Sequence, residues 1–148
     1  TVFDEMYQSG EIDAELVPQG TLAERIRAAG SGIGAFYTRT GVGTEMAEGK
    51  ESRIIDGKEY LLEYPIPADY AFVRALRADE FGNLQFKLSQ RNFNPIMGMA
   101  AKMTIVEVEE EILKPGEIDP DNVHLSGVFV DRIVRIPKDG IWDKINRR

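Results

Sequence analysis

The chain has 148 residues, enough for one domain with a sizeable core, and its net charge of −7 argues against non-specific binding to nucleic acid or anionic membranes. It contains no cysteine and a single histidine, His124, which excludes disulfides, thiolate metal sites and histidine-rich metal sites. No apolar stretch reaches the ~20 residues of a membrane-spanning helix, and the N-terminus does not follow the pattern of a signal peptide. We therefore expect a soluble cytoplasmic protein that needs no metal and binds neither nucleic acid nor membrane.

The first elements come from hydrophobic periodicity. Residues 2–9 carry an apolar helical face that ends at Gly10. Because the chain starts inside this helix without methionine, we expect it to be part of a longer polypeptide or a processed product. Alternating apolar residues predict a strand over 11–17. Thr21 and Glu24 form a capping-box pattern, which predicts a helix over 22–29 with Gly30 as its C′ residue.

The remainder of the chain alternates between strands and helices. Asp56-Gly57 predicts a tight hairpin turn, strands are expected over 70–76, 104–113 and 128–136, and Asn94 and Pro95 predict a helix start. The acids Glu107 and 109–111 are interpreted as a solvated strand edge. The fold class is α/β, with a mixed, largely parallel sheet flanked by helices and a β-hairpin insertion. We expect one domain over 1–136 and a C-terminal tail over 137–148, in which Trp142 is a packing or interface residue.

The stretch from Gly30 to Ala35 matches the G-x-G-x-x-A fingerprint of dinucleotide-binding folds. That motif needs a strand before its glycines and a helix after them, whereas here the glycines follow a helix. The order disfavours a nucleotide site. A helix C-cap followed by a mobile loop explains Gly30, but Phe36 and Tyr37 among the later glycines favour an ordered loop.

Other candidates have both a structural and a functional interpretation. Asn92 and Asn94 of "RNFNP" could hold a polar ligand, or Asn94 could cap a helix while Asn92 bonds the preceding turn. Gln19 of "PQGT" lies where a strand meets a helix, beside amides of Leu22 and Ala23 that could stabilise negative charge, or it is a surface residue of a turn. His124 is interpreted as a hydrogen-bonded loop histidine in preference to a catalytic one.

The combination of "VPQGTLAERIRAAGSGIGAFYTRTGVGT", "RADEFGNLQFKLSQRNFNP" and "AAKMTIVEVEE" resembles the A (α) subunit of the family I CoA-transferases, almost from Thr1 to about Ile136. The resemblance implies movement of CoA between short-chain carboxylic acids by a ping-pong mechanism, through a glutamyl-CoA thioester on a partner, the B (β) subunit. CoA would be a substrate, no cofactor would be needed, and the assembly would be a hetero-oligomer. The resemblance also implies that this chain is the C-terminal portion of its subunit, without part of the sheet.

The resemblance assigns no catalytic nucleophile to this chain. It places Gln19 opposite the substrate carboxylate, Gly20 and Phe36 in the wall of the cleft, and Asn92 and Asn94 near it. A 3-oxoadipate CoA-transferase remains an alternative, as does a non-catalytic module that kept the fold as a ligand sensor or scaffold. A nucleotide-binding oxidoreductase domain is disfavoured by the order of helix and glycines.

Overall fold

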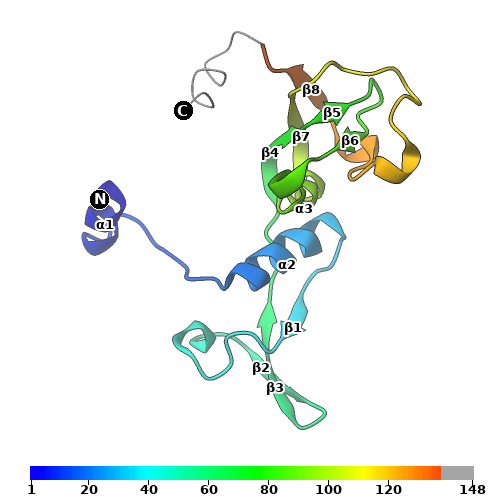
Figure 1. Cartoon of the computed structure of the whole chain (residues 1–148). Coiled ribbons are helices and arrows are strands. Elements are labelled where there is room, and N and C mark those ends of the chain that lie inside the picture. Colours follow the sequence, from blue (N-terminus) through cyan, green and yellow to red (C-terminus); the bar gives the residue numbers. More distant parts are fainter. Residues whose placement is uncertain (138–148) are drawn as a thin grey trace. The chain divides into compact units, whose positions relative to one another are not determined.

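A computed structural model describes residues 1–137 and divides the chain into two compact units. The first unit combines Thr1–Leu22 with Phe36–Glu63, and the second combines Ala23–Ala35 with the chain from Tyr64 onward. Helix α2 (Gln19–Gly30), labelled in Figure 1, contains residues of both units: its first turn belongs to the first and its remainder to the second. The single domain expected over 1–136 stays a prediction.

A three-stranded antiparallel sheet forms the centre of the first unit. Its order is β1 (Phe36–Thr38), β3 (Lys58–Glu63), β2 (Ser52–Ile55). Asp56 and Gly57 connect β2 to β3 with φ values of 50° and 73°, the left-handed geometry of a type I′ hairpin turn. Helix α1 (Val2–Gln8) and a 3₁₀ turn (Glu45–Ala47) complete this unit, and the predicted hairpin is confirmed.

A parallel sheet forms the centre of the second unit, in the order β4 (Ala68–Ala75), β7 (Ala101–Val108), β8 (Arg132–Arg135), as Figure 1 shows. Helix α3 (Asn94–Ala100) lies in the connection between β4 and β7 and packs on both strands. A short antiparallel pair, β5 (Arg77–Ala78) and β6 (Leu84–Gln85), follows β4. The remaining regular elements are the 3₁₀ turns Leu88–Arg91, Pro120–Asn122 and Gly127–Phe129. The predicted fold class is confirmed.

The core of the second unit lies on one face of this sheet. Alternate residues of β4 and β7 enter it, among them Val73 and Val106, which are register partners. Phe86 and Leu125 complete it from the loops beyond the sheet. Hydrophobic residues at every second position are buried here because a strand presents alternate side chains to one face.

One predicted strand does not form, and one predicted helix has different boundaries. Residues 11–17 form no strand, and Leu16 is largely exposed, so the apolar alternation there has no sheet partner to stabilise it. Helix α2 begins at Gln19, which places Thr21 inside the first turn and not at the N-cap. Gly30 is the last residue of this helix, and the positive φ expected of a C′ glycine occurs at Gly32.

The acidic run after β7 also differs from the prediction. β7 is the central strand of its sheet and not an edge. The acids that follow it pair with arginines of the same unit: Glu109 with Arg74, Glu110 with Arg77 and Glu111 with Arg135. The first part of the strand expected over 128–136 is a 3₁₀ turn, and Trp142 and most of the predicted tail lie outside the described residues.

Candidate functional site

Gln19 and Gly20 are the first two residues of helix α2, and both are exposed. The amide of Leu22 donates to the carbonyl of Pro18 at 2.9 Å, so it is used within the helix and is not available to a ligand, contrary to the prediction. The backbone amides that have no acceptor inside the helix are those of its first turn, which starts at Gln19. Within the described part of the chain the Gln19 carboxamide makes no hydrogen bond, so it can donate to and accept from a bound molecule.

Thr21 is a polar residue of the same turn that the structure leaves unsatisfied. Its side chain is buried, and among the described residues its hydroxyl has no hydrogen-bond partner. The capping-box pattern predicts that this hydroxyl accepts from the Glu24 amide while the Glu24 side chain bonds back to the Thr21 amide. In the structure the Glu24 carboxylate instead accepts from Arg27 Nε, which lies 3.0 Å from each of its oxygens. An unsatisfied buried hydroxyl costs stability.

Phe36 begins β1 and is half-buried. Its register partner on β3 is Glu63, a buried carboxylate that accepts from the ammonium of Lys50 at 2.6 Å. Phe36 therefore lies in a strand, opposite the carboxylate of a buried ion pair, as expected for an ordered segment. Its place in the wall of a cleft stays a prediction.

Asn94 has a different function from the helix cap that its position suggests. The N-cap of α3 is Phe93, without a side-chain hydrogen bond, and Pro95 lies in the first turn as predicted. The Asn94 carboxamide is bonded at both ends: Oδ1 accepts from the Arg74 amide at 3.1 Å, and Nδ2 donates to the Gln90 carbonyl at 2.9 Å. Asn94 therefore ties α3 to strand β4.

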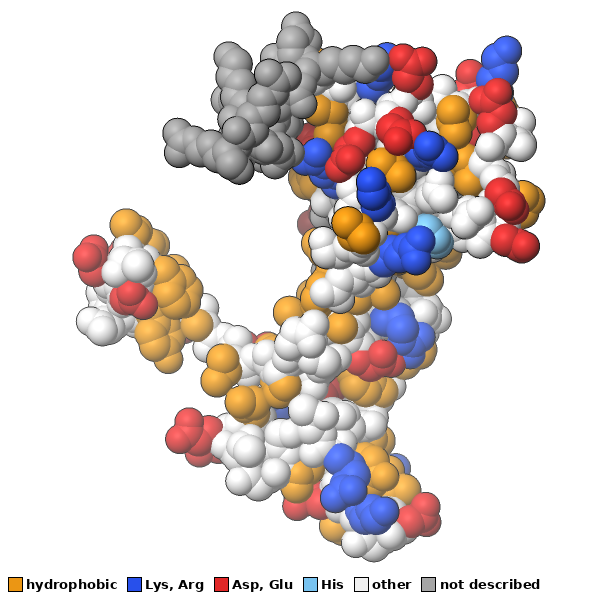
Figure 2. All heavy atoms as spheres, viewed as in Figure 1, with side chains coloured by type: hydrophobic (Ala, Val, Ile, Leu, Met, Phe, Trp, Pro, Cys, Tyr) orange, Lys and Arg blue, Asp and Glu red, His pale blue; other side chains and the backbone are white. Residues whose placement is uncertain are grey.

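These contacts place the asparagine motif at the carboxyl end of the parallel sheet. Gln90 donates to Glu109 at 2.9 Å, and the same Glu109 oxygen accepts from Arg74 Nε at 2.8 Å. Figure 2 shows basic and acidic side chains intermixed over this part of the surface. Open α/β sheets bind their ligands outside the carboxyl ends of their strands, so this location supports a binding role for the segment.

Asn92 is the exposed member of the motif. Its backbone amide donates to the Ser89 carbonyl at 3.0 Å, but its carboxamide has no hydrogen bond to any described residue. The adjoining 3₁₀ turn contains Leu88, which is 80% exposed and has a φ of 50°. A left-handed leucine costs about 1–2 kcal/mol, and strained residues concentrate at functional sites. No sequence pattern indicates Leu88, because leucine is not a residue typical of that conformation.

His124 is a hydrogen-bonded loop residue, as interpreted from the sequence. Its Nδ1 accepts from the Phe86 amide at 2.9 Å, and the two rings stack with centroids 6.3 Å apart. Burial, and secondarily the positive charge of Arg91, lower the pKa of His124 from its ordinary value. The imidazole is therefore a neutral acceptor beside the core.

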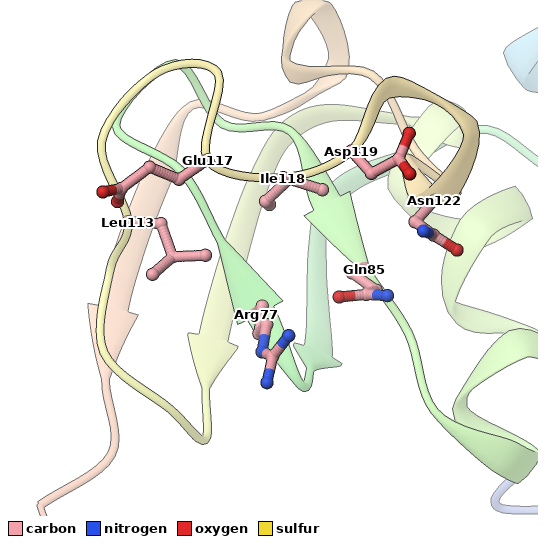
Figure 3. Close-up of a pocket in the computed structure, with 7 residues that line it drawn as sticks. All are labelled: Arg77, Gln85, Leu113, Glu117, Ile118, Asp119 and Asn122. Carbon is pink, nitrogen blue, oxygen red and sulfur yellow. The ribbon is translucent and has the colours of Figure 1, made fainter.

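Two pockets in the described part of the chain are candidate ligand sites. The pocket in Figure 3 has a volume of about 160 Å³, below the usual range of ligand sites, and the carboxylates of Glu117 and Asp119 point away from each other. Glu117 accepts from the Lys114 amide, and Asp119 caps the next 3₁₀ turn through the Asp121 amide. These polar groups are used locally and do not converge on a ligand.

The pocket of the first unit has a volume of about 320 Å³ and is predominantly acidic, with Glu15, Glu45 and Glu48 in its lining. Its one cation, Lys50, pairs with Glu63 and lies 3.6 Å from Glu15. An anionic substrate would meet like charge there, and no predicted site residue lines this pocket. Among residues 1–137, no three acidic or histidine side chains gather to hold a metal ion, and no helix is long and apolar enough to span a bilayer.

The sequence itself is similar to known proteins. A family model described as coenzyme A transferase matches residues 1–135. The chain is 53% identical to the A subunit of 3-oxoadipate CoA-transferase from Pseudomonas putida, over 91% of this chain and 58% of that protein. It is 55% identical to the A subunit of a probable succinyl-CoA:3-ketoacid coenzyme A transferase from Bacillus subtilis, over 90% and 56% of the two chains. The alpha subunit of acetate CoA-transferase from Escherichia coli is 51% identical, over 85% and 57%. The chain thus spans little more than half the length of these relatives.

Solved structures share the fold at lower identity. An acyl-CoA transferase of Escherichia coli O157:H7, in a thioester complex with CoA, superposes with a TM-score of 0.76 at 22% identity, over 93% of this chain and 30% of that one. Glutaconate coenzyme A-transferase of Acidaminococcus fermentans gives a TM-score of 0.75 at 22% identity, over 91% and 49%. A decarboxylase matches with a TM-score of 0.72 at 24% identity, over 91% and 50%, so the fold alone does not determine the reaction. The match of the family model over most of the sequence does identify the family, and the chain belongs to the coenzyme A transferases.

Proposed function

We propose that this chain is part of the A (α) subunit of a CoA-transferase that moves CoA between short-chain carboxylic acids. The observation that carries the proposal is the similarity to proteins named as A or alpha subunits, at 53%, 55% and 51% identity over at least 85% of the chain. The proposed substrates are a 3-oxoacid such as acetoacetate together with succinate or acetate. A 3-oxoadipate enzyme is the alternative, because the identities to the differently named relatives are nearly equal.

The reaction is proposed to follow a ping-pong course through a glutamyl-CoA thioester on a partner, the B (β) subunit. A carboxylate is a poor acyl acceptor in water, so such chemistry needs a dry site with oriented hydrogen-bond donors for the oxyanions that form. Two exposed carboxamides are each a candidate for that role, Gln19 of the first unit and Asn92 of the second, and neither is bonded within residues 1–137. Asn94 is proposed to position its segment, because both ends of its carboxamide are already bonded.

The activity can be tested with the protein purified together with its partner. We expect transfer of CoA from succinyl-CoA or acetyl-CoA to acetoacetate, parallel double-reciprocal plots, and a CoA-sized mass increase on the partner when the acceptor is omitted. Faster transfer to 3-oxoadipate would favour the alternative. A stable protein with no partner and no transfer to any of these acids would instead support the non-catalytic module.

The role of Gln19 has its own test. Gln19→Ala should lower kcat by roughly 100-fold, the usual effect of losing one hydrogen-bond donor to a developing oxyanion, while the two subunits still co-elute. Gln8→Ala is the matched control, because Gln8 is an exposed glutamine at the end of α1 that has no proposed role. Equal kinetics of the two variants would show that Gln19 does not face the substrate.

A further inference from the structure

His124 is held in a fixed orientation by Phe86. Its Nδ1 accepts from the Phe86 amide at 2.9 Å, and the two rings stack at an interplanar angle of 14°. Because a neutral imidazole carries one proton and Nδ1 is the acceptor, that proton is on Nε2. No described residue accepts a hydrogen bond from Nε2, and the side chain is partly exposed. His124 therefore presents one oriented N–H donor that the described residues do not use.

Arg91 is bonded to the same residue. Its Nε donates to the Phe86 carbonyl at 3.3 Å, so the guanidinium and the imidazole both lie against the backbone of Phe86, which is 1% exposed. Arg91 itself is exposed, and within residues 1–137 its two terminal nitrogens have neither a hydrogen bond nor a carboxylate partner. These nitrogens are available to a bound molecule on the side of Phe86 where His124 lies.

The 3₁₀ turn that ends at Arg91 is anchored at its other residues. The Gln90 Oε1 accepts from the Lys87 amide at 2.8 Å, and the Gln90 Nε2 donates to Glu109 at 2.9 Å. The Gln90 carbonyl accepts from Asn94. Arg91 therefore extends from a backbone that is already fixed, and a donor held in place before binding loses less conformational entropy when a ligand arrives.

No described carboxylate neutralises this pair of donors. Burial, and secondarily the charge of Arg91, lower the pKa of His124, and no acidic side chain opposes them. The carboxylates of the loop before His124 bond backbone amides of that loop, Glu117 that of Lys114 and Asp119 that of Asp121. An uncompensated guanidinium beside an oriented imidazole N–H is suited to an anion, because the guanidinium supplies charge and a planar pair of donors and the imidazole adds a further donor.

We propose that Arg91 and His124 form a subsite for a phosphate group, and that in the proposed reaction this group belongs to coenzyme A. Only the identity of the ligand rests on the proposed function. Phosphate is the better match than a carboxylate, because its additional oxygens can accept from both the guanidinium and the imidazole. The next residue in the chain is Asn92, whose unbonded carboxamide is proposed to face the reacting groups. One short segment would then contact two parts of the same thioester.

The subsite can be tested by measuring equilibrium binding to the complete protein, purified with its partner. Arg91→Gln removes the charge, and thermal denaturation establishes that the variant is folded. Lys114→Gln is the matched control, because Lys114 is an exposed cation of the same unit that forms no ion pair within residues 1–137. Each protein is titrated with CoA and with pantetheine, which is the thiol arm of CoA without its phosphates.

We expect Arg91→Gln to weaken the binding of CoA about tenfold, as for the loss of a charged hydrogen bond, and to leave the binding of pantetheine unchanged. Lys114→Gln should bind both as the parent protein does. Unchanged CoA binding in Arg91→Gln would overturn the proposal. An equal loss for pantetheine would overturn it too, because Arg91 would then act on the fold and not on a phosphate.

Inorganic phosphate distinguishes the source of the anion. It should compete with CoA in the parent protein and much less in Arg91→Gln. Phosphate that binds through Arg91 without competing with CoA would assign the subsite to the free ion and contradict the proposal. None of these measurements depends on turnover. Binding of CoA that depends on Arg91, with no transfer to any acid, would support the subsite and refute the transferase. Normal transfer with unaltered CoA binding in Arg91→Gln would refute the subsite and leave the transferase standing.

The imidazole gives a second readout, by NMR of the complete protein with labelled histidine. The signal of His124 is the one that disappears in His124→Asn. Binding of CoA should raise the pKa of His124, because a nearby anion favours the charged imidazole and offsets the effect of Arg91. Pantetheine should leave it unchanged. A pKa of His124 that saturating CoA does not raise would contradict the proposal.

Discussion

Gly30 lies directly against Met99: a Cβ atom built on Gly30 would come within 2.5 Å of Met99 Cβ and 2.8 Å of its carbonyl carbon. This contact joins the end of α2 to the end of α3 within the second unit. Gly30 does not have a positive φ, so its small size, and not its backbone freedom, is what the structure requires.

Gly30→Ala should therefore lower the free energy of unfolding by about 1–3 kcal/mol, the usual cost of overpacking a close contact. Backbone atoms of Met99 are among those the new methyl group would meet, so the helices must separate to accommodate it. Urea denaturation measures the effect. The matched control is Gly34→Ala, because a Cβ at Gly34 meets nothing within 4 Å and its φ is not positive. Its stability should stay equal or rise, by up to about 1 kcal/mol. Equal losses in both variants would contradict the packing role.

Local signals predicted those parts of the fold that depend on a few consecutive residues. Asp56-Gly57 specified the β2–β3 turn because left-handed conformations are accessible to those residues. The alternation at Ile12, Ala14 and Leu16 predicted a strand that does not form, because a strand also needs a partner strand and the described residues supply none there. Family resemblance, and not spacing, supplied Phe36 as a site candidate.

Long-range contacts account for most of what the sequence left undetermined. The sequence indicated Asn94 as part of the asparagine motif. Its hydrogen bond to the Arg74 amide joins residues 20 positions apart, so no local pattern could predict it. Thr21 matched a capping pattern with Glu24, yet α2 begins at Gln19 and removes Thr21 from the cap. Leu88 gave no signal at all, because its strain is imposed by the surrounding turn.

The two asparagines of the motif should respond differently to truncation. Asn94→Ala leaves the Arg74 amide and the Gln90 carbonyl without their partner and should cost about 1–3 kcal/mol of unfolding free energy. Asn92→Ala removes an exposed side chain and should change stability by less than about 0.5 kcal/mol, while lowering kcat if the proposed function is right. Thermal denaturation and steady-state kinetics on both variants separate the roles. A large stability loss in Asn92→Ala would show that this side chain has a structural partner.

His124 should make stability depend on pH. Its pKa is lowered in the folded protein, so the unfolded chain binds the proton more tightly and stability must rise with pH in this range. The contribution is complete above about pH 6.5, the ordinary pKa of histidine, and is lost progressively as the pH falls from there towards the lowered folded value. Denaturation at a series of pH values from about 8 to about 5 measures this slope.

The control for that slope is His124→Asn. The Asn Oδ1 can occupy the position of Nδ1 and accept from the Phe86 amide, but it does not titrate. The variant should lose a part of the stability at neutral pH, through the missing ring stack, and show a shallower slope below about pH 6.5. An unchanged slope in His124→Asn would mean that other groups cause the acid sensitivity.

Leu88→Asn should relieve strain at the turn that precedes the asparagine motif. Asparagine tolerates the left-handed conformation, and little apolar burial is lost because Leu88 is 80% exposed, so the free energy of unfolding should rise by up to about 1 kcal/mol. Val128→Asn is the control, an equally exposed apolar residue without a positive φ, and should give no gain. If the strained leucine serves the binding site, Leu88→Asn should also raise KM for the acyl-CoA while the assembly of the subunits is unchanged. If Leu88→Asn is more stable but has unaltered kinetics, Leu88 is strained but has no part in binding. If Leu88→Asn is no more stable than Val128→Asn, the turn does not strain residue 88.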